Sequence, residues 1–487
     1  MIAPSFKSLT KDILYYGLGN MLYSLVQFFS MPIVVKSMAK SEVANWNILL
    51  PTGVLLAAIV TFGMDSAVVR FVKDAKTEQE KKTIFSTGFF FETGLAIFLA
   101  AGMWLFAGQL QTAIKVSPDY NSSWWMLIIW LPGVIIAQYF QNWFKYTFRR
   151  SLFLSLILVQ SAIYFAGIIL MKICGHVNLF NVMLAMVASQ FAVAIAGFFY
   201  CRNLFTFSVN RKLLGQLLIY GLPFMVLSFG YNFIASIDRY MLAGKISEAD
   251  FAIYTQGFRI SAIISMVVSS FNFAFGPFLL SILGQPQAKH VLPRFHTYYL
   301  MVMCFIGLCF MALAKIIIQL LAGIDYIDGQ KFMLLFVIGY IFYGMYSFAQ
   351  AGIIHSRKSY LGLYTLLAGL TVVFLIDFFF VKKYMGFGTA TGFMVANIVM
   401  VILAGIFSAK YVPVRYNFLK DGILLVVLFG GGLLLSTFSL SANIYIDGGV
   451  KLGTVILVAG SILFLLLSVT DKLYISNLIS GRKLTSM

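Results

Sequence analysis

The chain has 487 residues, of which 61% are hydrophobic and 11% are charged, and its formal net charge is +18. Soluble globular domains carry about 25% charged residues, so this composition excludes a chain built of several soluble domains. The basic residues occur singly or in small groups between apolar runs rather than in one stripe, which argues against a nucleic-acid-binding surface.

Apolar runs of about 20 residues, long enough to cross a hydrocarbon core about 30 Å thick, follow one another along the whole chain. The first run, Ile13 to Val35, is too long for the apolar core of a signal peptide, so we expect it to remain as a membrane helix. The pattern predicts an all-α polytopic membrane protein with about fourteen transmembrane helices. The expected spans are residues 13–35, 45–68, 85–109, 124–145, 151–171, 180–201, 215–241, 251–282, 295–322, 331–355, 360–381, 388–409, 421–439 and 449–470.

Most basic residues lie in alternate breaks between these spans, on the same side as the two ends of the chain. Cytoplasmic loops of membrane proteins carry an excess of Lys and Arg, so we expect both termini to be cytoplasmic. These breaks contain Arg70, Lys73, Lys76, Lys81, Lys82, Lys145, Arg149, Arg150, Arg202, Arg211, Lys212, Lys289, Arg294, Arg357, Lys358, Lys410, Arg415 and Lys420.

A weak internal repeat relates the first and seventh spans. Tyr16-Gly17-Leu18 matches Tyr220-Gly221-Leu222, and Ser41-Glu42-Val43-Ala44 falls against Ser247-Glu248-Ala249-Asp250. Six spans separate the two starts, which is typical of parallel repeats in transporters. The repeat therefore predicts two six-helix lobes around a central cavity, with two further helices at the C-terminus. The expected domains are residues 1–212 for spans 1–6, 213–412 for spans 7–12, and 413–487 for spans 13–14 and a cytoplasmic tail.

Motifs for nucleotide hydrolysis and for metal binding are missing from the sequence. Gly244-Lys245-Ile246 lacks both the hydroxyl residue and the upstream glycine of a phosphate-binding loop. The cysteines and histidines have no ligand spacing for a metal. We therefore expect no cofactor and no metal, and we expect that the protein is not an enzyme. The residues considered are Cys174, Cys201, Cys304, Cys309, His176, His290, His296 and His355.

Ionisable residues within or beside the spans are the candidate functional groups, because a charge near the bilayer centre costs at least about 2.5 kcal/mol and is usually turned toward a cavity or a partner. Arg259 either faces a cavity or extends to the outer interface. Asp238 and Arg239 are adjacent and point about 100° apart on a helix, so we expect that they do not simply neutralise one another. Either they face different surroundings or they cap a helix end. The eight candidates are Asp65, Arg70, Glu92, Asp238, Arg239, Arg259, Lys315 and Asp377.

The four acidic candidates differ in their sequence neighbours. Asp377 lies near Lys382 and Lys383 and has a purely structural alternative, which is to pair with them. Glu92 has no obvious local partner and is the better of these two for ion coupling. The acidic residues Glu92, Asp238, Asp65 and Asp377 are the candidate coupling residues.

Five segments carry a resemblance to a known family. They are Gly63-Met64-Asp65-Ser66-Ala67-Val68-Val69-Arg70, Tyr220-Gly221-Leu222-Pro223, Asp238-Arg239-Tyr240-Met241-Leu242, Ala252-Ile253-Tyr254, and Phe271-Asn272-Phe273-Ala274-Phe275-Gly276-Pro277-Phe278. Together they resemble the bacterial polysaccharide-export flippases, the O-antigen and exopolysaccharide translocases of the multidrug/oligosaccharidyl-lipid/polysaccharide exporter superfamily.

The resemblance implies a substrate and a location. The substrate would be an oligosaccharide on undecaprenyl diphosphate, moved by alternating access from the cytoplasmic to the periplasmic leaflet of the bacterial inner membrane. Cavity cations would bind the diphosphate and anionic sugars, and Arg can contact phosphate oxygens bidentately. A proton gradient, a sodium gradient or the membrane potential would drive transfer, the potential being worth about 2.3 kcal/mol per charge per 100 mV. Membrane lipids, and the polymerase and glycosyltransferases of the pathway, would be partners. The candidate substrate-binding cations are Arg259, Arg239, Arg70 and Lys315.

Other functions stay open at this point. A multidrug or cation antiporter of the same superfamily would prefer an acidic cavity, whereas Arg239, Arg259 and Lys315 are embedded cations. A membrane glycosyltransferase or polysaccharide polymerase would need a long external loop with catalytic acids. A flippase for a lipid-linked peptidoglycan precursor is a further alternative. The sequence leaves the sugar, the coupling ion and the oligomeric state open.

Overall fold

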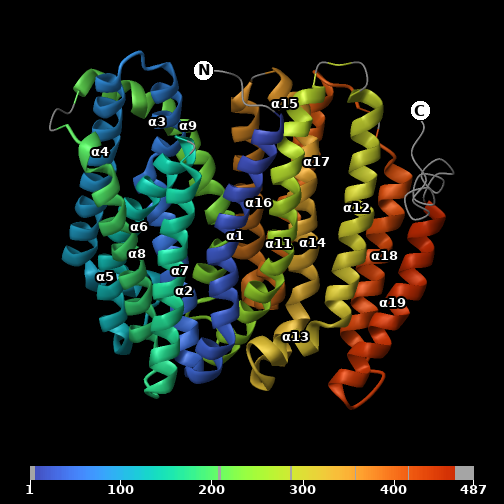
Figure 1. Ribbon diagram of the computed structural model, residues 1–487. Helices are drawn as coiled ribbons and strands as arrows, with labels where there is room; N and C mark the ends of the chain where they lie inside the picture. Colours follow the sequence, from blue (N-terminus) through green and yellow to red (C-terminus); the bar gives the residue numbers. More distant parts are fainter. Residues whose placement is uncertain are drawn as a thin grey trace. The chain divides into compact units, whose positions relative to one another are not determined.

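The computed structural model describes the backbone of residues 6–147, 149–206, 210–283, 285, 288–356, 358–414 and 416–466. These residues form helices and three short 3-10 turns, and within these ranges there is no β-strand (Figure 1). The helices are α1 (Phe6–Ser37), α2 (Lys40–Thr61), α3 (Met64–Asp74), α4 (Glu78–Leu105), α5 (Ala107–Ile114), α6 (Asn121–Tyr146), α7 (Arg150–Ile173), α8 (Leu179–Cys201), α9 (Arg211–Ile234), α10 (Ile237–Leu242), α11 (Glu248–Ile282), α12 (Ala288–Ala312), α13 (Ala314–Leu321), α14 (Gln330–Ala349), α15 (Ala351–Ser356), α16 (Ser359–Tyr384), α17 (Gly386–Ala409), α18 (Phe418–Thr437) and α19 (Ile444–Leu466).

The expected all-α membrane fold is confirmed. Among the described residues, 12 helical segments are long and apolar enough to cross a membrane, and Leu22–Ser37 of α1 is a shorter apolar helix. The helix α19 lies where the last span is expected. Within the described residues each of the fourteen expected spans therefore coincides with a helix, and residues 467–470 of the last span and the tail to residue 487 lie outside them.

Five expected spans are interrupted near one end. The span expected over 45–68 stops at Thr61, where Phe62 (φ 46°) and Gly63 (φ 66°) take left-handed backbone angles before α3 begins. A left-handed residue ends a helix because it turns the chain off the helical path. The other four spans also divide into a long helix followed by a short one. They are the spans expected over 85–109 (α4 then α5), 215–241 (α9 then α10), 295–322 (α12 then α13) and 331–355 (α14 then α15).

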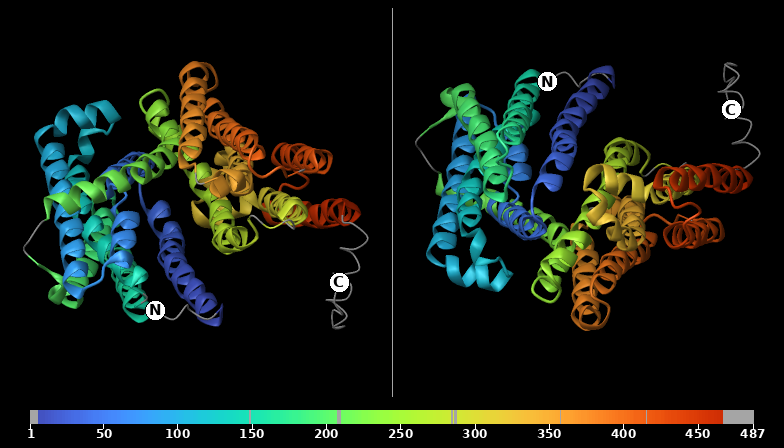
Figure 2. Two further views of the ribbon diagram at one scale, coloured as in Figure 1. Left: turned by 90° about the horizontal axis from the view of Figure 1, so that it is seen from above. Right: turned by 90° about the horizontal axis from the view of Figure 1, so that it is seen from below.

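Contacts divide the chain into two compact units. The first contains residues 1–256, 321–326 and 362–399, and the second contains residues 257–320, 327–361 and 400–487. The domain boundaries after 212 and 412 that the sequence suggests stay a prediction. In the second unit α12 packs on α18 and α19, and Figure 2 shows these helices grouped together when viewed along their axes.

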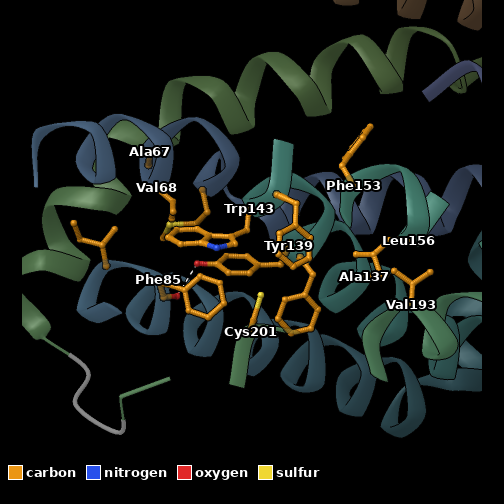
Figure 3. Close-up of a cluster of buried hydrophobic side chains, with 14 of the residues drawn as sticks. Ala67, Val68, Phe85, Ala137, Tyr139, Trp143, Phe153, Leu156, Val193 and Cys201 are labelled. Carbon is orange, nitrogen blue, oxygen red and sulfur yellow. Dashed lines mark hydrogen bonds between the residues drawn. The ribbon is translucent and has the colours of Figure 1, made fainter. Parts of the chain in front are cut away.

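The first unit is built around an aromatic core. The rings of Phe85 on α4 and Trp143 on α6 lie 4.6 Å apart between centroids, and the Tyr139 hydroxyl donates a 2.7 Å hydrogen bond to the Phe85 carbonyl oxygen (Figure 3). Phe140 and Phe144, also on α6, are fully buried in the same core. This packing fixes α6 against α4 and sets the direction of the remaining faces of α6.

Candidate functional site

The first unit contains a cavity of about 620 Å³ that is partly open to its surroundings. Residues of α1, α2, α3, α6, α7, α8 and α9, together with Gly63 at the α2–α3 break, form its wall. The lining residues are Tyr23, Gln27, Leu50, Val54, Ala57, Ala58, Thr61, Gly63, Asp65, Ser66, Trp130, Val134, Gln138, Gln141, Asn142, Ile157, Gln160, Met186, Gln190, Phe224, Ser228 and Asn232.

Helix α6 contributes one continuous stripe to the cavity wall. Trp130, Val134, Gln138, Gln141 and Asn142 all line the cavity, and they follow one another at spacings of four, four, three and one. Residues three and four apart lie on one face of a helix, so this spacing places the five side chains together. The aromatic core holds the other side of α6, which keeps the polar stripe turned to the cavity.

Amides dominate the polar chemistry of the cavity. Carboxamides both donate and accept hydrogen bonds, so such a wall suits a ligand with many hydroxyl groups. Asp65 is the one charged residue among the lining residues, and none of these residues is Lys, Arg or His. The amide residues are Gln27, Gln138, Gln141, Asn142, Gln160, Gln190 and Asn232, and the hydroxyl residues are Tyr23, Thr61, Ser66 and Ser228.

Some polar groups in the wall are held in place and others lack a partner. Gln141 Nε2 donates a 2.8 Å hydrogen bond to Gln160 Oε1, which ties α6 to α7. By contrast, the buried Gln190 Oε1 and Trp130 Nε1 have no hydrogen-bond partner within the part of the chain that the structure describes. Buried polar atoms are nearly always paired, so these two atoms are available to water or to a ligand.

The acidic candidates Asp65 and Glu92 occupy different places. Asp65 lies in the first turn of α3 at the cavity wall, where its Oδ1 accepts a 2.8 Å hydrogen bond from the Ser66 backbone N–H. Glu92 lies on α4, is only 3% exposed and is not among the cavity-lining residues. It interacts electrostatically with Asp65, and among the described residues no hydrogen bond or ion pair reaches it.

Asp238 and Arg239 form an ion pair, contrary to the sequence argument. Arg239 Nη1 lies 3.6 Å from Asp238 Oδ1, and both side chains are buried. The same Nη1 donates to the Ala235 carbonyl oxygen at 2.6 Å. The guanidinium therefore turns back toward the end of α9, which brings it close to the Asp238 carboxylate. The expectation that adjacent residues on a helix stay apart was wrong because a long arginine side chain covers the angle between them.

A hydrogen-bonded chain extends from this ion pair to α17. The Tyr254 hydroxyl donates to Asp238 Oδ2 at 2.8 Å, and Thr389 Oγ1 donates to the Tyr254 hydroxyl at 2.9 Å. Two of the segments that carry the family resemblance, the one with Asp238-Arg239 and the one with Tyr254, thus meet in one buried network. A buried charge is tolerated where such partners surround it.

Asp377 is the most isolated acid among the candidates. It is fully buried on α16, and neither carboxylate oxygen has a hydrogen-bond partner in the described ranges. The pairing with Lys382 or Lys383 does not occur, since these exposed residues lie five and six positions further on and project from other faces of the helix. On α17, a Cβ added to Gly392 would lie 2.3 Å from Asp377 Oδ1, so the acid packs directly on that backbone.

None of the four candidate cations is among the cavity-lining residues. Arg70 pairs with Asp74 at 3.5 Å with more than half of each side chain exposed, and Arg239 pairs with Asp238. Lys315 and Arg259 belong to the second unit. The part that these cations play in binding a substrate stays a prediction.

Lys315 belongs to an ionic cluster in the second unit. Its Nζ donates to Ser439 Oγ at 2.6 Å and lies 3.9 Å from Asp447 Oδ2. Buried Lys451 pairs with the same Asp447 oxygen at 2.9 Å and donates to the Leu435 carbonyl oxygen. This cluster joins α13, α18 and α19, which gives Lys315 a structural role in addition to the proposed one.

Sequence comparison identifies the family. A profile of the family described as polysaccharide biosynthesis protein matches residues 9–283. The chain belongs to this family. An uncharacterized membrane protein of Haemophilus influenzae is 23% identical over 295 residues, which is 58% of this chain and 68% of that protein. Lsg locus putative protein 1 of the same organism is 19% identical over 336 residues, 67% of this chain and 80% of that protein.

Solved structures share the fold of this member of the polysaccharide biosynthesis protein family. The lipid II flippase MurJ in an inward closed conformation aligns with a TM-score of 0.64 and 15% identity, covering 91% of this chain and 99% of its own. A multidrug resistance MATE family transporter of the MOP superfamily, inward-facing, aligns with a TM-score of 0.63 and 13% identity, covering 83% and 95%. The profile match confirms the family resemblance that the sequence suggests, and the solved structures show the shared fold.

The amide residues of the cavity are not among the candidates that the sequence indicates. Asp65 is an ionisable residue beside a span, whereas Gln and Asn carry no charge and so do not stand out within an apolar run. The signal that could have found them is the recurrence of Gln138, Gln141 and Asn142 at helical spacing from Trp130.

Proposed function

We propose that this member of the polysaccharide biosynthesis protein family is a flippase for an oligosaccharide linked to undecaprenyl diphosphate. It moves this lipid by alternating access from the cytoplasmic to the periplasmic leaflet of the bacterial inner membrane. The observation that carries the proposal is the amide-lined cavity of about 620 Å³ within a unit of membrane helices. Polar side chains inside a membrane are costly unless they face water, a ligand or a partner.

The size and chemistry of the cavity fit a sugar head group. Ligand cavities commonly enclose about 300–1,000 Å³, so this one has room for a few sugar rings. A hydroxyl group that leaves water for hydrocarbon without a hydrogen-bond partner costs at least about 2 kcal/mol, so an oligosaccharide cannot cross unaided. The amides and hydroxyls of the wall supply the missing partners while the lipid chain stays in the bilayer.

The diphosphate and the driving ion need charged groups. In this proposal Arg259, helped by Arg239, Arg70 and Lys315, neutralises the diphosphate, because guanidinium groups bind phosphate oxygens bidentately. Glu92, Asp238, Asp65 and Asp377 are the proposed coupling acids. Glu92 and Asp377 are the strongest of these, since a buried carboxylate without a partner is best satisfied by taking up a proton or a sodium ion.

The proposed setting is that of a transporter rather than an enzyme. Both termini are cytoplasmic, and the polymerase and glycosyltransferases of the same pathway supply and consume the lipid-linked oligosaccharide. Reporter fusions test the topology: those at Lys76, Lys212 and Lys472 should report the cytoplasm and one at Glu248 the periplasm. A periplasmic signal at Lys212 would break the fourteen-span topology.

A cation antiporter is the second candidate function, and the observation in its favour is Asp65. This carboxylate is the one charged residue among the cavity-lining residues, and aromatic Trp130 and Phe224 lie in the same wall. An organic cation can bind between a carboxylate and aromatic faces. The large number of amides in the wall favours the sugar instead, because an organic cation has few groups to pair with them.

Transport by the purified protein separates the two functions. We would reconstitute the full chain in liposomes that contain a polyprenyl diphosphate carrying a labelled oligosaccharide, and follow its exposure to a glycosidase added outside. The proposal predicts protein-dependent exposure that exceeds the rate in protein-free liposomes. Uptake of a cationic dye in the same vesicles, with no exposure of the oligosaccharide, would favour the antiporter and reject the flippase.

A further inference from the structure

The charge of the cavity wall differs from what a diphosphate requires. Among the lining residues there is no basic side chain, and Asp65 supplies a negative charge. An anion in this cavity would meet a carboxylate without a cation to offset it, which is unfavourable at short range in a site partly shielded from water. The cavity is therefore poorly suited to the diphosphate and equally to an acidic sugar.

The hydrogen-bonding groups of the wall suit an uncharged sugar. Carboxamides offer a carbonyl acceptor and an N–H donor side by side, which matches hydroxyl and acetamido groups that also do both. The wall has seven such residues, from Gln27 to Asn232, on five different helices. Tyr23, Trp130 and Phe224 add aromatic surface, against which the C–H face of a sugar ring can pack.

Two buried polar atoms of the wall can form hydrogen bonds with a ligand. Gln190 is 4% exposed and Trp130 is 6% exposed, and among the described residues neither Gln190 Oε1 nor Trp130 Nε1 has a hydrogen-bond partner. One is an acceptor and the other a donor, so a ligand hydroxyl can donate to the first and another can accept from the second. The Trp130 indole packs directly against Gly53, where an added Cβ would lie 2.7 Å from the ring.

We infer that this cavity binds the sugar part of the lipid-linked substrate and selects uncharged, hydroxyl- and acetamido-bearing sugars over acidic ones. The inference rests on the proposed flippase function and adds the class of sugar. It separates two tasks, since the wall contacts the sugar while the diphosphate is bound by cations that are not among the lining residues.

Binding to the full chain in detergent tests the inference. The probes are a polyprenyl diphosphate carrying a neutral trisaccharide of hexose and N-acetylhexosamine, the same molecule with one hexose replaced by a hexuronic acid, and the bare polyprenyl diphosphate. We expect the neutral probe to bind about tenfold more tightly than the acidic one, the factor typical of one unfavourable polar contact.

Variants of the wall locate the effect. Gln190→Leu and Trp130→Phe each remove one of the unpartnered polar atoms and should weaken binding of the neutral probe about tenfold while leaving the bare polyprenyl diphosphate unchanged. Gln138→Lys places a cation at an exposed position of the wall and should raise the affinity for the acidic probe. Gln109→Leu, on the exposed surface of α5, is the matched control and should change nothing.

The outcomes distinguish failure of the inference from failure of the function. If the acidic probe binds wild type as tightly as the neutral one, or if Gln190→Leu and Trp130→Phe keep wild-type affinity, the sugar assignment is wrong even when liposome transport works. If no probe binds and no oligosaccharide is transported, the flippase function itself is wrong. Melting curves of each variant exclude loss of fold as the cause.

Discussion

Gly63 and Gly221 meet backbone to backbone. A Cβ added to Gly63 would lie 2.2 Å from the Gly221 carbonyl oxygen, and one added to Gly221 would lie 2.3 Å from the Phe62 carbonyl oxygen. The two glycines come from two segments that carry the family resemblance, one at the α2–α3 break and one in α9. Because Gly63, Asp65 and Phe224 all line the cavity, this contact fixes part of the cavity wall.

Adding a methyl group at this contact should destabilise the protein. We expect Gly221→Ala to lower the free energy of unfolding by about 1–3 kcal/mol through overpacking. Gly63→Ala should cost more, since its φ of +66° adds about 1–2 kcal/mol of backbone strain. Thermal unfolding of the purified variants measures both. Gly94→Ala in α4, where nothing lies within 4 Å of the added Cβ, is the control and should not lower the melting temperature. Equal melting temperatures for the wild type and the three variants would contradict a close backbone contact between Gly63 and Gly221.

The network around Asp238 should behave as one energetic unit. Arg239→Leu leaves Asp238 buried without its cation and should cost about 3–5 kcal/mol. Asp238→Asn in the same chain should recover part of that loss, because it removes the stranded charge. Tyr254→Phe deletes the hydroxyl that donates to Asp238 and should cost about 1–3 kcal/mol. The measurement is a double-mutant cycle of melting curves. Strictly additive effects of Arg239→Leu and Asp238→Asn would refute the pairing.

Glu92 and Asp377 should affect coupling rather than folding. Asp377 has no hydrogen-bond partner within the described residues, so Asp377→Asn should leave the melting temperature unchanged or higher. We expect Glu92→Gln or Asp377→Asn to abolish the stimulation of liposome transport by a proton or sodium gradient. Glu78→Gln, which alters an exposed pair with Lys81, is the control. Undiminished gradient dependence in both variants would remove Glu92 and Asp377 as coupling residues.

Arg259 should matter through the geometry of its side chain. Arg259→Lys keeps the charge but loses the planar fork, so it should retain partial transport, whereas Arg259→Ala should lose most of it. Lys331→Ala, at an exposed pair with Asp328, is the matched control for loss of one positive charge. Transport rates are compared at equal amounts of protein in the membrane. A normal rate for Arg259→Ala would make the residue an interfacial anchor only.

The spans could be predicted from the sequence because they depend on composition alone. The break at Phe62 and Gly63 could not, since Phe62 is a residue that ordinarily avoids positive φ and is held there by packing against α9. The pairing of Asp238 with Arg239 depends on a side chain that bends back to Ala235, which helical spacing does not reveal.

The cavity could not be predicted from the sequence because its wall forms only when helices far apart in the chain pack together. Asp65 is visible in the sequence as a charge beside a span, but Gln160 and Gln190 become wall residues only when α7 and α8 pack against α6. Charge alone also selected residues that do not line the cavity. Arg70 and Lys315 are candidates because they are charged, but in the structure each lies beside an acidic residue outside the cavity wall.

Exposure of the lipid-linked oligosaccharide in cells tests the central claim most directly. In a strain that makes the oligosaccharide but lacks this chain, the lipid-linked intermediate should accumulate and stay protected from a membrane-impermeant probe added to spheroplasts. Expression of the wild-type chain should restore labelling of the intermediate at the periplasmic face. Labelling that is equally fast with and without the chain would contradict the account, because the lipid would then reach the periplasmic leaflet by another route.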